Sequence, residues 1–482
     1  MTQAHGDRLE PGLLRLIGVL LLGGLMGLLD STIVNVGIGT MAHHFGATLN
    51  TVGWVATGYL LAVGVAIPFT AWAVERFGSK KMWLIGLSLF VLGSLASGVS
   101  WDIESLIAFR VIQGFGGGVL DPIMLTVLAK VAGPSRVARV MGLMGVVIPL
   151  GPVLGPILGG VLVQGLGWRW MFLINLPIGL AAILLSLRVV PADPSSRERS
   201  AAPRLDIIGL ALLGPAFAIL AFALSQAAGD AGFGAAPVIG ALVLGAVLLA
   251  AYVAHAVRVG VKAIIRLSLF RSRSFSASVT VMGLTGIMLF SMLFLVPLYQ
   301  QRVRGHEVLA AGLLVAPLGI GSFLAMPIAG RLGDTVGARR LAPLGGLIVA
   351  LGALVHTQAD DRTSEILLGL CAFAAGVGLG FIGAPTMGSL YRTLPQDAIA
   401  QGTSALYIIN QLGASLGTAV VALLLQSQAD ASSTQVQSFR GASWWVFAAA
   451  VAVLVSGWFL PGRAATAPVA EEPAAVEASA RS

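Results

Sequence analysis

The sequence carries little charge: only 10% of its 482 residues are Asp, Glu, Lys or Arg, whereas 57% are hydrophobic. Soluble globular proteins carry about 25% charged residues, so this composition does not fit a water-soluble fold. The only cysteine, Cys371, lies inside an apolar run, which excludes an intramolecular disulfide and indicates no metal site. No G-x-x-x-x-G-K-[ST] motif occurs, so no nucleotide-binding loop is expected. No nucleophile–base pair stands out, and we expect neither an enzyme nor a cofactor.

Long apolar runs recur along the whole chain and are separated by short polar loops, which is typical of a polytopic all-α membrane protein. The basic residues lie in loops beside these runs, so membrane topology explains the net charge of +8 better than a nucleic-acid partner does. The runs predict fourteen transmembrane helices, at about 13–36, 50–72, 82–100, 104–128, 137–163, 168–189, 206–226, 236–257, 276–299, 309–329, 341–357, 365–387, 403–426 and 441–461.

The distribution of basic residues predicts the orientation of these helices. An even number of helices places both termini on one side, and 23 of the 29 Lys and Arg residues fall in the terminal segments and the even-numbered loops. Cytoplasmic loops carry an excess of Lys and Arg, so both termini are expected in the cytoplasm. Residues 191–204 and the tail after Pro461 lack the apolar content to pack and are expected to be disordered.

An internal repeat divides the chain. AWAVERFGSKK at 71–81 and GRLGDTVGARR at 330–340 share an acid at the fifth position, glycine at the eighth and basic residues at the last two. A weaker similarity relates the predicted fourth and twelfth helices, where Gly376, Gly378 and Gly380 repeat the spacing of Gly114, Gly116 and Gly118. Such repeats are typical of secondary transporters, which bind substrate near the membrane midplane between the repeats.

The repeat predicts two six-helix bundles with two inserted helices. We expect a cytoplasmic N-terminus (1–12), a first bundle (13–189), a cytoplasmic linker (190–205), two inserted helices (206–257), a second cytoplasmic linker (258–275), a second bundle (276–461) and a disordered cytoplasmic tail (462–482).

The motifs resemble those of the major facilitator superfamily, specifically its fourteen-helix drug:proton antiporter branch, over roughly residues 13–461. The second loop copy matches the signature G-x-L-x-D-x-x-G-x-R-R completely, whereas the first has Ala71, Ala73 and Glu75 in place of Gly, Leu and Asp. The resemblance extends to LLDSTIVNVG (28–37), RVIQGFGGG (110–118), PLGPVLGPILGG (149–160) and WRWMFLINLPIG (168–179). It implies the major facilitator fold, with two six-helix bundles plus two inserted helices, fourteen in all.

Asp30 and Arg110 are the candidate proton-coupling residues. Asp30 lies in the outer half of the first helix and Arg110 at a similar depth in the fourth, so the two can neutralise each other. A carboxylate whose distance from an arginine changes during the cycle can gain and lose a proton. Two alternatives remain open: a fixed ion pair that only joins the two helices, and an Arg110 side chain that snorkels to the outer interface.

Asp121 is a third ionisable residue in the fourth helix, where the family has an apolar residue before the proline. It lies on the same face as Arg110, about 16 Å further toward the cytoplasm. One interpretation is a second carboxylate in the cavity, which attracts a cation or takes a proton. The other is an N-cap before Pro122, at a break in the helix.

Two sets of residues are predicted to control the change of conformation. Prolines and glycines of the fifth helix can bend it and shape the cavity, although tight packing is the alternative. The acids of the two loop copies can partner helix ends and arginines, which would hold an outward-open state; a solvated turn is the alternative. These residues are Gly151, Pro152, Gly155, Pro156, Gly159, Glu75, Arg76, Asp334, Arg339 and Arg340.

Polar and aromatic residues in or near otherwise apolar helices are candidate substrate contacts, since pockets for apolar cations or aromatics need such groups. Interfacial anchoring is the alternative for each aromatic residue. The candidates are Asn35, Trp54, Tyr59, Gln113, Tyr299, Gln300, Tyr407, Asn410 and Gln411.

These observations predict a proton-driven exporter of hydrophobic, cationic or aromatic compounds that works by alternating access. The expected partners are small hydrophobic substrates, protons and the lipid bilayer. The chain is expected to act as a monomer in a bacterial cytoplasmic membrane. The alternatives are an exporter of one metabolite or antibiotic, a lipid translocator, or, in a different class, a transport-inactive membrane scaffold or sensor.

Overall fold

The computed structural model describes residues 10–144, 150–193, 205–228, 232–429 and 435–462. These residues form helices and no strand, and thirteen of the helices are long and apolar enough to cross a membrane. The expected all-helical polytopic architecture is therefore confirmed. The predicted helix 137–163 falls on the end of α4 and on α5, and residues 145–149 between them lie outside the described residues, so the count of fourteen stays a prediction.

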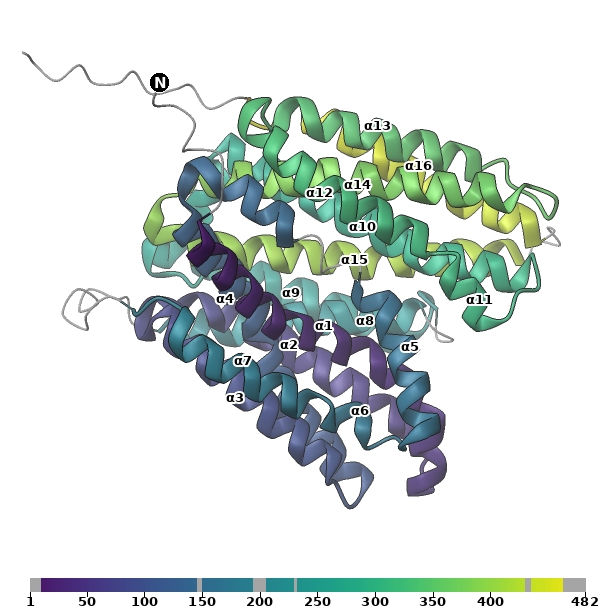
Figure 1. Cartoon of the computed structure of the whole chain (residues 1–482), viewed down its shortest axis with the longest axis horizontal. Coiled ribbons are helices and arrows are strands. Elements are labelled where there is room, and N and C mark those ends of the chain that lie inside the picture. Colours follow the sequence, from purple (N-terminus) through teal and green to yellow (C-terminus); the bar gives the residue numbers. More distant parts are fainter. Residues whose placement is uncertain (1–9, 145–149, 194–204, 229–231, 430–434, 463–482) are drawn as a thin grey trace, which may run out of the picture.

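The first half of the chain runs from purple to blue in Figure 1. Its elements are α1 (Pro11–Phe45), α2 (Leu49–Phe77), α3 (Ser79–Gly98), α4 (Ile103–Met144), α5 (Leu150–Gly165), α6 (Trp170–Leu173) and α7 (Asn175–Val189). The fourth helix was expected to end near residue 128. The membrane span in α4 runs to Gly133, where the backbone departs from helical angles, and a second helical segment of α4 continues from there to Met144. Gly133 has a positive φ of 69°, which a glycine adopts at little cost, so the backbone turns there without a loop.

The second half runs from green to yellow, and the inserted helices stand between the two halves in the sequence. The inserted elements are α8 (Ile207–Ala228), α9 (Ala236–Val259) and the short 3₁₀ turns η1 (Gly260–Lys262) and η2 (Leu267–Arg271). The second half contains α10 (Arg273–Arg302), α11 (Val308–Leu313), α12 (Ala316–Thr335), α13 (Ala338–His356), α14 (Glu365–Thr393), η3 (Gln396–Ala398), α15 (Ile399–Ala429) and α16 (Gln435–Gly457).

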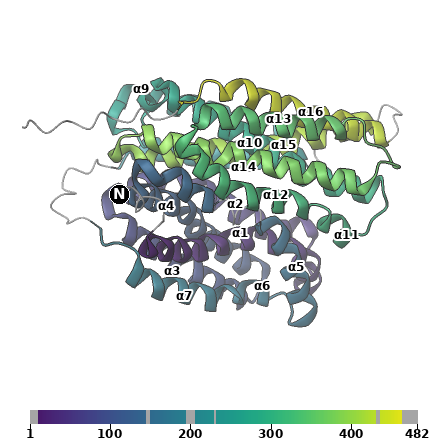
Figure 2. The ribbon, with the colours of Figure 1, turned by 45° about the horizontal axis from the view of Figure 1, so that its top comes forward.

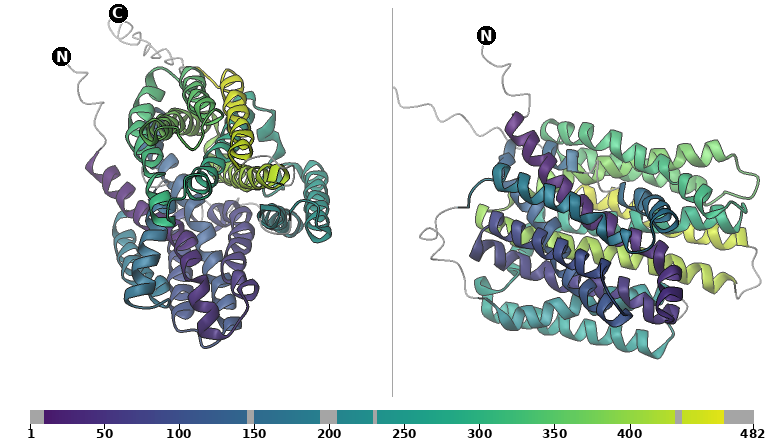
Figure 3. Two further views of the ribbon diagram at one scale, coloured as in Figure 1. Left: turned by 90° about the vertical axis from the view of Figure 1, so that its right-hand side faces the viewer. Right: turned by 60° about the horizontal axis from the view of Figure 1, so that its bottom comes forward.

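The two halves lie against each other with their helices roughly parallel. Figure 2 shows α3 and α7 on one outer side and α13 and α16 on the other. The end-on view in Figure 3 (left) shows the halves one above the other, with α8 and α9 (teal) to one side. Across the junction α4 contacts α12 and α14, whereas α15 contacts α2, α4 and α8. The interior between the halves is therefore lined by α2, α4, α12, α14 and α15.

The loop repeat has one conformation in both copies. Gly78 follows α2 with φ 95° and ψ 157°, and Gly337 precedes α13 with φ 87° and ψ 156°. Only glycine adopts this region readily, which explains why the eighth position of each copy is glycine.

The glycine repeat also has a common packing role. Gly114 and Gly118 of α4 face the α2 backbone at Tyr59 and Val63, whereas Gly116 faces α3. Their counterparts in α14 repeat this alternation: Gly376 and Gly380 face α12, and Gly378 faces α13. Each glycine allows two helix backbones to approach closely, so both copies place three helices in tight contact.

Candidate functional site

An aspartate and an arginine form an ion pair inside the first half. The Arg110 Nη1 on α4 donates to the Asp30 Oδ2 on α1, and both residues are 1% exposed. The two residues that the sequence places at a similar depth are thus in direct contact. Because the guanidinium is buried, the interpretation that Arg110 snorkels to the interface is wrong.

Two amides complete the surroundings of the Asp30 carboxylate. Its Oδ1 accepts from the Gln113 Nε2 at 2.9 Å and from the Asn175 Nδ2 at 3.0 Å. Both amides also donate to the Ser94 Oγ, at 3.1 and 3.0 Å. A buried ion pair is stable only where its remaining lone pairs are hydrogen-bonded, as they are here. We call Asp30, Ser94, Arg110, Gln113 and Asn175 the buried polar cluster.

The arginine has further partners that do not depend on the charge of Asp30. Its Nε donates to the Val55 carbonyl at 3.1 Å, and its Nη1 donates to the Gln113 Oε1 at 2.9 Å. The Tyr59 ring lies 4.1 Å from its Cζ, a cation–π distance. Arg110 is therefore held in place by contacts other than its ion pair with Asp30.

Sequence reasoning missed two members of the buried polar cluster, and it gave another role to a third member, Gln113, and to the neighbouring Tyr59. Asn175 lies within the recognised stretch WRWMFLINLPIG, where a lone amide among apolar residues was the available signal. Ser94 gave no signal, since serine is common at helix contacts in membranes. Gln113 and Tyr59, which we expected to contact substrate, are buried in this structure against Asp30 and Arg110.

The fifth-helix motif packs against the helix that carries Asp30. A Cβ at Gly155 would meet the Thr32 side chain, and one at Gly159 would lie 3.0 Å from the Ile33 carbonyl. Both glycines allow α5 to lie close to α1, immediately after Asp30. The burial of the other motif residues that we singled out lies outside what the structure describes; these are Gly151, Pro152 and Pro156.

Asp121 joins the two halves. Its Oδ2 accepts a hydrogen bond of 2.5 Å from the Tyr407 Oη on α15. The backbone of α4 is helical through Asp121 and Pro122 and departs from helical angles only at Gly133. The interpretation of Asp121 as a cap at a helix break is therefore wrong, and the carboxylate faces the interior between the halves.

Tyr407→Phe is expected to weaken this arrangement of the halves. It removes the hydrogen bond to Asp121, and hydrogen bonds to charged groups contribute about 1.5–3 kcal/mol. The expected result is a broader, longer distance distribution between spin labels on the exposed Lys81 and Gln396, measured in a Cys371→Ala background. Tyr391→Phe is the control, because its hydroxyl bonds Thr403 within the second half; an equal change in both variants would contradict the prediction.

The acids of the two loop copies have different partners. Glu75 accepts from the Gln401 Nε2 at 3.0 Å, a bond between the two halves. Asp334 pairs with Arg392 at 3.3 Å inside the second half. The loop arginines that we expected to pair with these acids are exposed: Arg76, Arg339 and Arg340. The partner of Asp334 is instead Arg392, at the end of α14.

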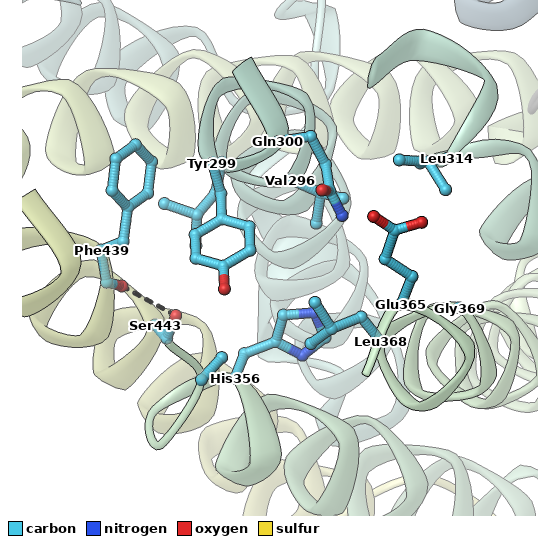
Figure 4. Close-up of a pocket in the computed structure, with 12 residues that line it drawn as sticks. Val296, Tyr299, Gln300, Leu314, His356, Glu365, Leu368, Gly369, Phe439 and Ser443 are labelled. Atoms are coloured by element: carbon cyan, nitrogen blue, oxygen red, sulfur yellow. Dashed lines mark hydrogen bonds between the residues drawn. The ribbon is translucent and has the colours of Figure 1, made fainter. Parts of the chain in front are cut away.

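Tyr299 and Gln300 line a pocket at one end of the second half. Figure 4 shows them with His356 and Glu365 around the same space. The pocket lies among the ends of α10, α13, α14 and α16, and its lining residues do not include any from the first half. The Tyr299 hydroxyl donates to the Asp360 carbonyl at 2.6 Å, so this side chain also holds a loop.

The remaining substrate candidates lie apart from one another. The Trp54 ring stacks on Phe222 of α8 at 5.9 Å, and Asn410 donates to the Met282 carbonyl at 2.8 Å. Gln411 lines a pocket between the halves, formed by α2, α8, α10 and α15, whose walls are mostly apolar. The side chain of Asn35 lies outside the described side chains.

Comparisons with known proteins agree with this architecture. The family model described as Major Facilitator Superfamily matches residues 20–418. The chain is 37% identical to the Multidrug resistance protein B homolog of Mycobacterium tuberculosis over 428 residues, covering 88% of this chain and 78% of that protein. It is 30% identical to the Multidrug export protein EmrB of Escherichia coli (strain K12), covering 82% and 77%.

Two solved structures share the fold. The human organic anion transporter MFSD10 (TETRAN) has a TM-score of 0.64 at 16% identity, covering 94% of this chain and 100% of that one. The proton:xylose symporter XylE has a TM-score of 0.65 at 16% identity, covering 93% and 96%. At such low identity these likenesses establish the arrangement of helices alone.

Proposed function

The chain belongs to the Major Facilitator Superfamily, and from this premise we propose that it is a proton-coupled antiporter that exports hydrophobic, cationic or aromatic compounds by alternating access. The relatives named for multidrug resistance and multidrug export support the export of drugs. We further propose a monomer with both termini at the cytoplasmic face, in accord with the distribution of Lys and Arg.

The observation that carries the coupling part of this proposal is the Asp30–Arg110 ion pair. An ionised carboxylate inside the membrane is costly and is retained where it serves an ion or proton pathway. Here Asp30 has one charged partner and two amide donors, all on other helices of the same half. Any movement of α1 relative to α4 therefore changes how well its negative charge is stabilised.

We propose the following use of this pair. When α1 shifts and separates Asp30 from Arg110, the carboxylate binds a proton from the outer side and becomes neutral. Arg110 stays charged and keeps its bonds to Val55 and Gln113. When the pair re-forms, the carboxyl group releases its proton toward the cytoplasm.

The contacts between the halves support an outward-facing state. The bent end of α4 packs on α12 and α14, where a Cβ at Gly330 would lie 2.6 Å from the Ala138 carbonyl. The Glu75–Gln401 bond lies at the same end, where α2 ends and α15 begins. This end is the cytoplasmic one in our topology. We call these contacts the cytoplasmic closure.

Dye efflux tests the proposed function. Cells of a pump-deficient host that express the chain are expected to extrude ethidium and other lipophilic cations, and a protonophore is expected to stop the extrusion. Extrusion of a single compound from a broad panel would favour a dedicated exporter. Equal dye retention in expressing and empty cells, with the protein confirmed in the membrane, would contradict the proposal.

A further inference from the structure

The segment that connects α9 to α10 is basic. Residues 258–273 run from the last turn of α9 to the first residue of α10 and contain five Lys or Arg residues and no acid; we call them the basic linker. Arg258, Lys262 and Arg271 are exposed and have no ion pair within the described part of the chain. The segment lies at the end of two membrane-length helices, and in the proposed topology this end faces the cytoplasmic lipid headgroups.

Apolar side chains stand beside these charges. Val257 and Val261 are 69% and 68% exposed, and Phe270 is 37% exposed. A side with exposed apolar residues next to basic ones is typical of segments that lie in a membrane interface. A free phosphate ion would engage the charges alone, whereas a phospholipid engages both kinds of side chain.

The other side of the basic linker is fixed to the protein. Ala263, Ile264 and Ile265 are buried, and the Ile265 N–H donates to the Tyr252 Oη at 3.0 Å. The Ile264 N–H donates to Asp206 at 3.4 Å. The linker therefore presents one fixed surface outward. The general excess of Lys and Arg in cytoplasmic loops does not explain this anchoring, because that excess requires only charge and no fixed conformation.

The basic linker is also bonded to the cytoplasmic closure. The Arg266 N–H donates to the Gln401 Oε1 at 3.2 Å, while the Gln401 Nε2 donates to Glu75. The Arg266 guanidinium pairs with Asp397 at 2.9 Å, just before α15. One amide side chain thus joins the linker, the second half and the first half.

From these contacts we propose that the basic linker binds the headgroups of anionic phospholipids, and that the bound lipid stabilises the cytoplasmic closure through Gln401. A basic residue near an anionic membrane surface strengthens binding by about fivefold. Lipid held by Arg258, Lys262 and Arg271 keeps the linker seated, which keeps the Arg266 N–H on Gln401. The occupancy of this surface would then set how readily the cytoplasmic end opens.

Lipid binding is tested directly with the full-length protein in nanodiscs. A fluorophore on Ser268→Cys, in a Cys371→Ala background, reports local lipid through quenching by brominated acyl chains. We expect brominated phosphatidylglycerol to quench more than brominated phosphatidylcholine at equal mole fraction. The triple variant Arg258→Gln/Lys262→Gln/Arg271→Gln is expected to lower the affinity for phosphatidylglycerol relative to phosphatidylcholine about 100-fold, because each of the three residues contributes about fivefold.

The control removes three other exposed charges, in Arg15→Gln/Arg188→Gln/Arg331→Gln. It is expected to keep the preference at Ser268. Equal quenching by the two lipids in the unsubstituted linker would overturn the proposal, as would an equal loss in both triple variants, because bulk charge would then explain the effect.

The link to the closure is tested with spin labels on Lys81 and Gln396. Phosphatidylglycerol is expected to shift the distance distribution toward the closed form. Gln401→Met is expected to abolish this shift while leaving the quenching preference at Ser268 intact. A full lipid-driven shift in Gln401→Met would overturn the coupling. None of these readouts needs transport, so a failure here is distinguishable from a failure of proton-coupled export.

Discussion

Asp30→Asn is expected to reduce proton-driven transport in proteoliposomes to the level of protein-free vesicles. Asparagine has nearly the same shape and can still accept hydrogen bonds from Gln113 and Asn175, so the packing around it is kept. It cannot be ionised, however, so no proton can be taken up or released at this position. Dye uptake driven by an imposed pH gradient measures the effect.

The same substitution is expected to lower stability. Arg110 is 1% exposed and would lose its only negative partner among the described residues, and removal of one member of a buried pair costs about 3–5 kcal/mol. The reverse variant, Arg110→Gln, should be less damaging, because a buried carboxyl group can become neutral by binding a proton whereas a guanidinium cannot lose one.

The double variant Asp30→Asn/Arg110→Gln separates the two effects. It leaves no buried charge, so its thermal stability is expected to lie above that of Asp30→Asn, while its transport remains absent. If Asp30→Asn transported at the wild-type rate under the same gradient, the ion pair would be structural only, which is the alternative that the sequence also allows.

Gly378→Val is expected to prevent accumulation of folded protein. A Cβ at this position on α14 would lie 2.6 Å from the Gly345 carbonyl and 2.7 Å from Val349, both on α13. Backbone cannot move away locally, so the two helices must separate, and overpacking costs about 1–3 kcal/mol or more. Gly116→Val, at the corresponding position on α4, should have the same effect, since its Cβ would lie 2.9 Å from the Gly86 carbonyl on α3.

Gly369→Val is the matched control on α14. Nothing lies within 4 Å of a Cβ at that position, so folding should be unaffected. The fraction of monodisperse protein after detergent extraction measures all three variants. A normal yield for Gly378→Val would show that α13 and α14 do not approach as closely as described.

Periodic and repeated features of the sequence predicted the architecture well. Runs of apolar residues give the helices, and the positive φ of Gly78 and Gly337 explains why the two loop copies share a glycine. The pairing of Asp30 with Arg110 followed from depth alone, because two opposite charges inside lipid have few other ways to be neutralised.

Contacts between distant segments could not be predicted in this way. The Asp121–Tyr407 and Glu75–Gln401 bonds join residues that are 286 and 326 positions apart. Their formation depends on how the two halves meet, which no local pattern encodes. The positions of two substrate candidates could not be predicted either. Tyr59 and Gln113 resemble pocket residues by type, yet the packing of α2 and α4 places them around the ion pair.

Proton release on substrate binding tests the coupling claim most directly. Purified protein in weakly buffered detergent solution is mixed with ethidium at several pH values, and a pH-sensitive dye records the protons released per bound ligand. We expect release from the wild type over a limited pH range and none from Asp30→Asn, with ethidium still bound. Equal release from the two proteins would contradict the assignment of proton coupling to Asp30.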